Sequence, residues 1–376
     1  MSLPVSAPDS EPVHDALAGP KASLAQKRWR ELGLFERIRR ELGVRVSLLS
    51  ANSEWRDPAL YGHPLVGDDY WFLAGRWDTF CAKVDPRRIH PRLGWTQGPL
   101  GRHNPMGLVP WTTERLRRDG RRKVLFYGDS FVGGHSSEAC WLPTLLEQGL
   151  GRSLDVLHLG VGGYGADQMH LLARETLPLV DRPELVLMGL MTHSFDRVAQ
   201  RVRSYQKPVV VPQPDGTLAV ANVPICRSPR RYFAWHGPSF RSYVHAAERH
   251  RASAPERDDF GFAGKATLNR AIIRANAQLA RAHGARLAYV LFHDHADLFR
   301  PTSRCQFFRE ALAEEGVELI DTAPVLLDHA RRNGTDASEL YVTAHHNDLG
   351  NRVLARAILE ALQQRGLTQG RAEVPA

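Results

Sequence analysis

The sequence has few cysteines: four in 376 residues, at positions 81, 140, 226 and 305. They lie far apart and show none of the paired spacings of zinc-binding modules. Four thiols spread over so long a chain also do not form a dense disulfide framework. The pattern argues against a structural zinc site and favours a reducing compartment.

Lysine is also scarce, and no basic stripe is present. Arginine and lysine together number 49 against 41 aspartates and glutamates, which gives a formal net charge of +8. The basic residues are scattered, are not interleaved with aromatic residues and match no nucleic-acid-binding motif. We therefore expect no DNA or RNA partner, while an anionic substrate stays open.

The chain lacks an apolar run of membrane-spanning length and a secretory start. Residues 1–20 are polar and contain proline, without a basic start and an apolar core. We expect residues 1–22 to be disordered and the protein to be cytoplasmic, with no membrane span. Leu24–Leu42 has apolar residues at helical spacing and a charged opposite face, which predicts a docking helix. Binding to a membrane surface is the alternative interpretation of this helix.

What remains is the composition of an ordinary globular chain, 43% hydrophobic and 24% charged. Apolar runs typical of buried strands alternate with helical patterns after residue 121, which predicts a doubly wound, flavodoxin-like α/β fold with five parallel strands. We place this domain at 121–366, after an N-terminal helical or irregular extension (23–120) and before a flexible tail (367–376). Residues 196–265 interrupt the alternation. We interpret them as an insertion over the active edge of the sheet, with a β-hairpin in Lys207–Pro224.

The expected elements are as follows. The strands are Val124–Tyr127, Asp155–Leu159, Leu185–Met191, Arg286–Phe292 and Val317–Ile320, and the helices are Ser137–Leu150, Ala166–Leu179, Ala266–His283, Ser303–Glu315 and Leu349–Gln364.

The first of these strands ends at Gly128 and is followed by Asp129 and Ser130. In an open α/β sheet, chemistry collects at the carboxyl ends of the strands. A serine hydroxyl placed there can act as a nucleophile if a base accepts its proton, and the backbone N–H of the serine can stabilise an oxyanion. The alternative is a turn serine that caps the next helix.

The second strand ends in a loop with glycines at 160, 162, 163 and 165. Such a loop exposes backbone N–H groups that can bind an anion. A plain tight turn or a phosphate cradle is the alternative. The dinucleotide-binding pattern that the loop superficially resembles belongs after the first strand, with an acidic residue at the end of the next strand. Here the next strand ends in Met191, Thr192, His193 and Ser194, so we expect no nucleotide cofactor, and no other cofactor is implied.

A third stretch, Tyr341–Gly350, places His345 and His346 just before the C-terminal helix, in a loop that can face the strand ends. A histidine there can reach Ser130. The alternative is a structural helix start, capped by Asn347 or Asp348.

Together, Gly128-Asp-Ser130, the glycine loop through Gly163 and His345-x-Asn347-x-x-Gly350 resemble the SGNH (GDSL) hydrolase family over residues 92–365. The similarity is greatest to bacterial members associated with polysaccharide modification, which are esterases or O-acyltransferases. The resemblance implies that Ser130 is the nucleophile, that Ser130 and Gly163 supply oxyanion N–H donors, and that His345 is the general base. It implies an ester of a carbohydrate or a small metabolite as substrate. Counting the family spacing from His345 predicts that its ring, and not that of His346, reaches Ser130.

The chain departs from the family pattern at two positions. The family supplies a third oxyanion donor as an asparagine, whereas this chain has His193, whose neutral imidazole can donate one N–H. The family also places an aspartate two or three residues before the catalytic histidine, whereas Val342 and Thr343 stand here. A carboxylate only orients the histidine and stabilises its charged form, so another group can replace it. Asp294, at the exit of the fourth strand, is the candidate by topology.

The sequence leaves three questions open. It does not choose between water and a hydroxyl as the acyl acceptor. The two altered positions leave room for a non-catalytic binding protein that keeps the cleft. His293, Asp294 and His295 are also compatible with a metal site completed by His345 and His346, the least favoured interpretation.

Overall fold

The computed structural model describes residues 85–367 except 119, 152, 153, 202, 204, 227–261 and 300. The expectations for a disordered start, for the helix Leu24–Leu42 and for the tail after residue 367 lie outside the described residues. So does most of the insertion after residue 226.

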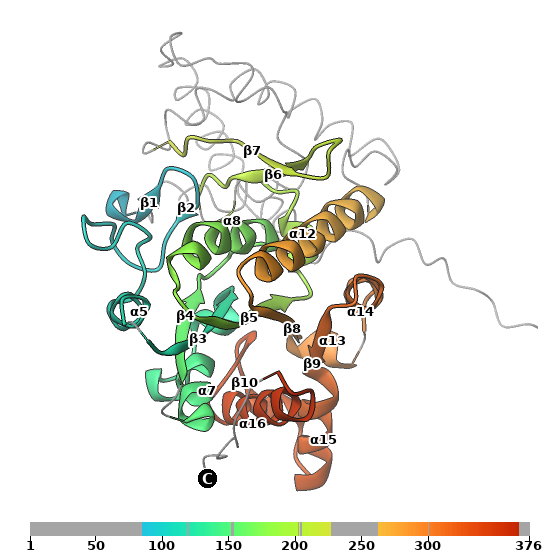
Figure 1. Cartoon of the computed structure of the whole chain (residues 1–376). Coiled ribbons are helices and arrows are strands. Elements are labelled where there is room, and N and C mark those ends of the chain that lie inside the picture. The colour runs from blue at the N-terminus through green and yellow to red at the C-terminus, as the bar shows by residue number, and fades with distance from the viewer. Residues whose placement is uncertain are drawn as a thin grey trace, which may run out of the picture.

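Five parallel strands form the central sheet, in the order β4-β3-β5-β8-β9 (Figure 1). Their bounds are β3 (Arg122–Gly128), β4 (Leu154–Gly160), β5 (Pro183–Met191), β8 (Arg286–Phe292) and β9 (Glu318–Asp321). All neighbouring pairs are parallel. β3 and β4 are almost entirely buried, as expected for strands covered on both faces. The five-stranded, doubly wound α/β fold expected from the sequence is therefore confirmed.

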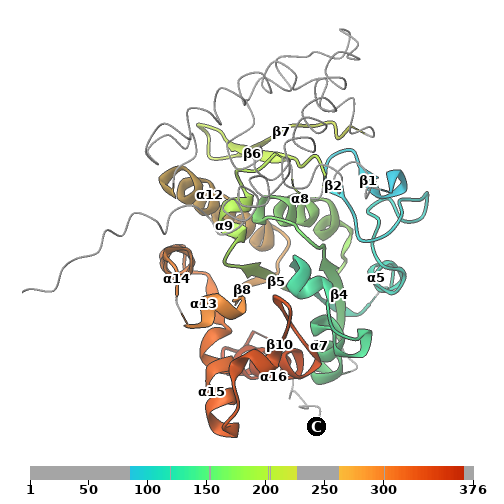
Figure 2. The ribbon, with the colours of Figure 1, turned by 180° about the vertical axis from the view of Figure 1, so that it is seen from behind.

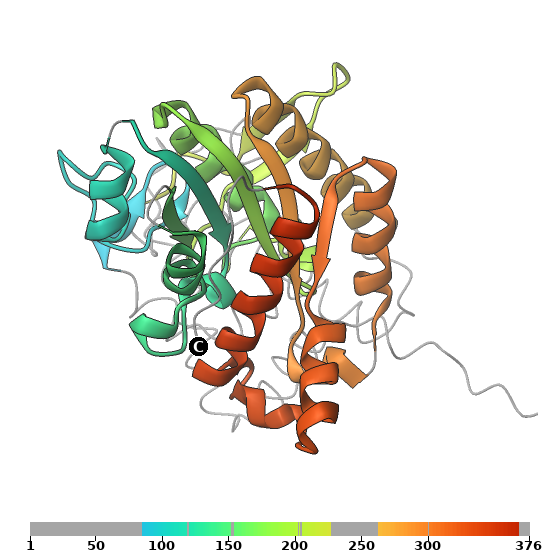
Figure 3. The same ribbon diagram turned by 60° about the horizontal axis from the view of Figure 1, so that its bottom comes forward.

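Helices cover both faces of the sheet (Figures 1 and 3). One layer contains α8 (Ala166–Thr176), α12 (Phe262–Ala282) and α14 (Ser303–Glu314), whose apolar residues share one core cluster. The other contains α7 (Leu142–Leu150), α15 (Ala323–Asn333) and α16 (Asp348–Gln364), which belong to a second cluster. The helix α15 was not predicted from the sequence. The helix α7 begins later than predicted, because residues 138–140 form a separate 3₁₀ turn and the helix starts one residue before Pro143, which suits a first helical turn.

Three glycines lie side by side where the strands end. Gly128 of β3 pairs with Gly160 of β4 and Gly189 of β5. The short helix α6 (Ser130–Gly133) follows directly and packs Val132 on them, and a Cβ at Gly189 would lie 2.6 Å from Cγ2 of Val132. Because no side chain intervenes, the helix that begins at Ser130 sits directly on the carboxyl edge of the sheet.

The short helix α9 (Ser194–Arg197) leads into the insertion, and the expected hairpin follows, with β6 (Val209–Pro212) and β7 (Leu218–Ala221) paired antiparallel. The hairpin contacts α8 and α12 and lies beyond this helix layer, as both views show (Figures 1 and 2). Its location is the outer side of that layer. The placement of the rest of the insertion over the active edge stays a prediction.

Residues before β3 form a two-stranded ribbon, β1 (Ile89–His90) with β2 (Gly94–Trp95), and the helix α5 (Pro110–Leu116). Within the described ranges, the three cysteines are buried free thiols, and no helix is both long and apolar enough to cross a membrane.

Candidate active site

Ser130 is the first residue of α6. The side chain of Asp129 caps this helix by accepting the N–H of Phe131 at 3.0 Å, so Asp129 and not Ser130 has the capping role. The hydroxyl of Ser130 is thus left available for another partner at the strand ends.

That partner is His345, whose Nε2 lies 2.7 Å from Oγ of Ser130. His345 lies on β11 (His345–His346), which forms a small antiparallel hairpin with β10 (Tyr341–Val342) ahead of α16. The predicted register is confirmed, because the ring of His345 makes this contact. With the proton on Nδ1, Nε2 can accept the hydroxyl proton, as a general base requires.

His346 points into the core. Its ring packs against Phe131, Phe292 and Tyr341. Burial, with a smaller effect from the neighbouring His345 and His293, lowers the pKa of His346 to about 3. His346 is therefore an uncharged packing residue beneath the site.

The glycine loop lies beside Ser130. A Cβ at Gly162 would lie 3.9 Å from Cβ of Ser130, and Gly163 has a φ of +86°, which a residue with a side chain rarely adopts. The loop that carries Gly163 is therefore adjacent to the serine. The oxyanion role of Gly163 stays a prediction.

Residues of the N-terminal ribbon hold this loop. Nε1 of Trp95 donates to the carbonyl of Gly162 at 2.9 Å, and the hydroxyl of Tyr164 donates to the carbonyl of Trp95 at 2.7 Å. Gln97 donates to the carbonyl of Gly160 at 2.5 Å. The sequence predicted a helical or irregular extension here and assigned no role at the site to it. Trp95 could have indicated one, because a buried indole N–H needs a hydrogen-bond acceptor.

A buried arginine was also missed. The side chain of Arg197 is 3% exposed, and its Nη1 lies 2.5 Å from Oδ2 of Asp129. The same nitrogen donates to the carbonyl of Tyr164 at 2.8 Å. Arg197 therefore links the segment before Ser130 to the segment after Gly163.

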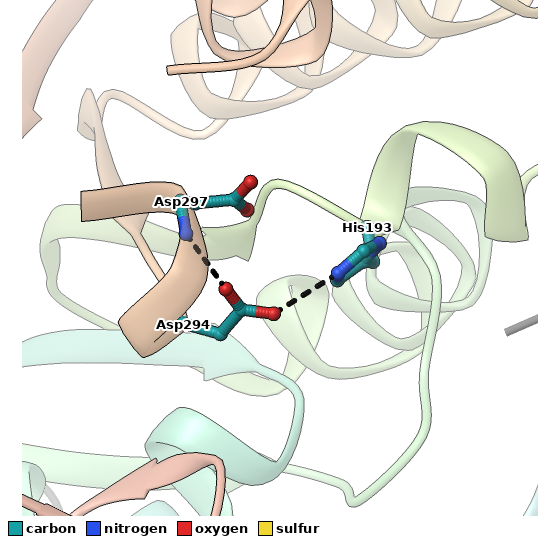
Figure 4. A group of neighbouring side chains, drawn as sticks. All are labelled: His193, Asp294 and Asp297. Carbon is teal, nitrogen blue, oxygen red and sulfur yellow. Dashed lines mark hydrogen bonds and ion pairs between the residues drawn. The ribbon is translucent and has the colours of Figure 1, made fainter. Parts of the chain in front are cut away.

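His193 and Asp294 form a pair (Figure 4). Nε2 of His193 lies 3.1 Å from Oδ2 of Asp294, and Oδ1 of Asp294 accepts the N–H of Asp297 at 3.0 Å. Burial would raise the pKa of Asp294, but the hydrogen bonds from His193 and Asp297 outweigh it and hold this pKa at about 2. Asp294 is thus an ionised acceptor, and Nε2 of His193 carries the proton.

This pairing changes both expected roles. In the structure, Asp294 orients His193. The expected role of Asp294 as the group that orients His345 stays a prediction. A neutral His193 has one N–H, and it is directed at Asp294. The expected role as a neutral oxyanion donor therefore needs correction: only a protonated His193 has a second N–H, on Nδ1, to offer.

The residues of the metal-site alternative point in different directions. Nε2 of His293 lies 2.8 Å from Oδ1 of Asp321, and its Nδ1 faces Sγ of Cys305 at 3.7 Å. The ring of His295 packs against Phe299 and Tyr341. Among the described residues, the one group whose ligand atoms converge is His193, Asp294 and Asp297, all within 4.8 Å of one another. This set differs from the expected one. Asp294 already bonds His193 and accepts the backbone N–H of Asp297, and the carboxylate of Asp297 accepts the hydroxyl of Thr192.

No protein-family model and no curated protein matched the chain. Solved structures did match it. The protein YxiM from Bacillus subtilis is 14% identical with a TM-score of 0.40, covering 66% of this chain and 58% of its own, so the chain spans a little over half of that structure. A member of the lipolytic G-D-S-L family from Veillonella parvula is 13% identical with a TM-score of 0.36, covering 65% of this chain and 99% of its own.

A carbohydrate acetylesterase family member from Sinorhizobium meliloti is 12% identical with a TM-score of 0.33, covering 65% of this chain and 99% of its own. Similarity at this level does not assign residues, so the chemistry has to be argued from the site itself. The chain has a doubly wound α/β fold, and the solved structures similar to it include enzymes of the GDSL (SGNH) hydrolase type.

Proposed function

We propose that this protein is a serine-dependent ester hydrolase or O-acyltransferase. The observation that carries the proposal is the 2.7 Å contact between Oγ of Ser130 and Nε2 of His345, made by residues 215 positions apart. A nucleophile hydrogen-bonded to a base at the carboxyl edge of a parallel sheet is the arrangement that acyl transfer through a covalent intermediate requires.

In the proposed reaction, Oγ of Ser130 attacks the ester carbonyl carbon while Nε2 of His345 takes the hydroxyl proton. The carbonyl oxygen becomes an oxyanion, for which the N–H groups of Ser130 and Gly163 are the proposed donors. The C–O bond to the alcohol then breaks, and His345 returns the proton to the leaving alcohol. Water or a second hydroxyl, deprotonated by His345, attacks the carbonyl carbon of the Ser130 ester. The bond between that carbon and Oγ then breaks, the acyl group leaves on the attacking oxygen, and His345 returns the proton to Oγ of Ser130.

The substrate class proposed is an O-acyl ester, with acetyl as the acyl group, of a carbohydrate or a small metabolite. It rests on the resemblance of the three motifs to enzymes of polysaccharide modification. A cytoplasmic location also stays a prediction from the sequence.

A fluorophosphonate probe tests the proposal, because it labels a serine whose proton a base accepts. We expect Ser130 to be labelled and hydrolysis of a small acetyl ester to be lost in Ser130→Ala. His345→Asn should slow labelling by roughly 10³-fold or more. Ser137 is a matched control: it is exposed and its Oγ lies 2.8 Å from Oδ2 of Asp348, yet no histidine contact is found for it among the described residues, so Ser137→Ala should label as wild type.

Absence of labelling between pH 6 and 9, together with an unchanged Ser130→Ala variant, would favour a binding protein that keeps the fold. If labelling occurs, product analysis decides between hydrolase and transferase. An acetyl ester incubated with sugars should transfer acetyl groups either to water or to sugar hydroxyls.

A further inference from the structure

The guanidinium of Arg197 bonds to groups at the ends of three neighbouring strands. It contacts Asp129 after β3 and the carbonyl of Tyr164 after β4, and its Nη2 lies 2.8 Å from Sδ of Met191, the last residue of β5. Asp129 directly precedes Ser130, and Tyr164 directly follows Gly163. One side chain therefore connects the segments that carry the two proposed oxyanion donors.

The connection is buried and charged. Asp129 is 0% exposed, and its second oxygen accepts the N–H of Phe131 in α6. Through this carboxylate, Arg197 also fixes the first turn of the helix that begins at Ser130. A planar guanidinium can direct separate N–H groups at acceptors in fixed directions, whereas an ammonium group on a flexible stem cannot reproduce that geometry.

We propose that Arg197 is a positioning residue for acyl transfer, which sets the separation between the N–H of Ser130 and the N–H of Gly163. This inference rests on the proposed function. Arg197 touches neither Ser130 nor His345 in the contacts found, so its effect is on the stabilisation of the oxyanion and not on the proton transfer. Because an oxyanion donor has to lie about 2.7 to 3.1 Å from the oxyanion, a small change in the separation of the two segments weakens binding of the transition state more than binding of the substrate.

The test compares Arg197→Met and Arg197→Lys with Lys123→Met. Lys123 is also a buried cation, 0% exposed, and it lies at the opposite end of β3, where its Nζ donates to the carbonyl of Arg118 at 2.5 Å and to Asp181 at 3.3 Å. Both substitutions to methionine remove a buried charge, but only Arg197 lies at the end of β3 that carries the site. The control therefore separates loss of stability from loss of positioning.

For an acetyl ester we expect kcat of Arg197→Met to fall by about 10²- to 10³-fold with little change in KM. Arg197→Lys should lie between this variant and wild type. Lys123→Met should lower the Tm and keep kcat at the wild-type value. The acidic limb of the pH–rate profile should stay in place in both Arg197 variants, since His345 is not altered.

A boronic acid adds a second measurement, because addition of Oγ of Ser130 to boron gives a tetrahedral anion that resembles the intermediate. Its affinity should fall in Arg197→Met by about the same factor as kcat/KM. If Arg197→Met does not fold, Arg197→Lys and Asp129→Asn replace it. An asparagine keeps the acceptor for Phe131 but weakens the bond to Arg197, so it should also lower kcat and boronate affinity.

Folded Arg197 variants with wild-type kcat and boronate affinity would overturn the inference while leaving the proposed function intact. A parallel loss in Lys123→Met would also overturn it, because the effect would then be a general loss of stability. If wild type shows no Ser130-dependent labelling, the proposed function fails, and the inference fails with it.

Discussion

The ring of His135 lies face to face with the ring of His345, with centroids 3.7 Å apart and an angle of 20° between the planes. His135 is exposed and lies just after α6, so it covers one face of the proposed general base. The stacked ring of His135 therefore restricts the orientation of the His345 ring.

We therefore predict that His135→Ala lowers kcat, because the ring that stacks on His345 and restricts its orientation is lost. His135→Phe keeps an aromatic ring at the same place and should keep most of the wild-type kcat. Steady-state hydrolysis of an acetyl ester is the measurement, and equal kcat in His135→Ala and wild type would show that the stack does not orient His345.

A second prediction concerns His193 and Asp294. If His193 stabilises the oxyanion, it does so in the protonated form, because its Nε2 proton is directed at Asp294. His193→Ala should then lower kcat by about 10²-fold.

The pair should also behave as a unit. His193→Ala and Asp294→Ala should each cost a similar factor, and the double variant should cost little more than either one. His193→Asn, whose side-chain amide keeps an N–H donor, is the conservative comparison. Equal activity of His193→Ala and wild type at all pH values would exclude His193 from the oxyanion site.

A third prediction contrasts two glycines of one loop. A Cβ at Gly160 would lie 2.6 Å from the backbone N of Gly133 and 2.8 Å from the backbone C of Val132, so Gly160→Ala has to push α6 away from β4. We expect a loss of roughly 1 to 3 kcal/mol in the free energy of unfolding and a large loss of activity. Thermal unfolding and ester hydrolysis measure both effects.

Gly162→Ala is the matched variant, because its Cβ would lie at an ordinary contact distance of 3.9 Å from Cβ of Ser130. It should fold with the wild-type Tm. The new methyl group should lower kcat/KM more for bulky acyl esters than for acetyl esters. A Tm loss equal to that of Gly160→Ala would contradict the assigned packing of this loop.

A fourth prediction concerns pH and stability. Burial would lower the pKa of His293, but its bonds to Asp321 and Cys305 outweigh burial and raise it from 6.5 to about 9. A raised histidine pKa contributes stability that is fully present below about pH 6.5 and is lost as the pH rises through about 9. The corresponding change is roughly 3 to 4 kcal/mol, since one pKa unit equals about 1.4 kcal/mol.

Burial would likewise raise the pKa of Asp321, but the bond from His293 dominates and holds it at about 2. A lowered carboxyl pKa contributes stability that is present above about pH 4 and is lost as the pH falls through 2. The pair should therefore stabilise most between about pH 4 and 6.5. Denaturant unfolding at pH 6 and pH 10 should show a loss in wild type that is much smaller in His293→Asn, and an equal loss in both would exclude this pair as its cause.

Local sequence patterns determined the strands of the sheet and part of the candidate site. The apolar runs predicted the five strands because strands buried on both faces need continuous apolar sequence, and β8 was predicted to the residue. The family spacing counted from His345 also identified which of two adjacent histidines reaches Ser130. In the structure the two rings lie on opposite sides, because successive residues of a strand alternate.

Only the tertiary structure decided the partners of the charged groups. Arg197 and Asp129 are 68 residues apart, His193 and Asp294 are 101 apart, and His345 and His135 belong to different elements. Each of these side chains had several possible partners at the same edge of the sheet, and the choice among them follows from the exact positions of the strand ends. A sequence pattern states which face a residue occupies, but a hydrogen bond depends on distances of a few tenths of an ångström, which are fixed only when the strands and helices pack together.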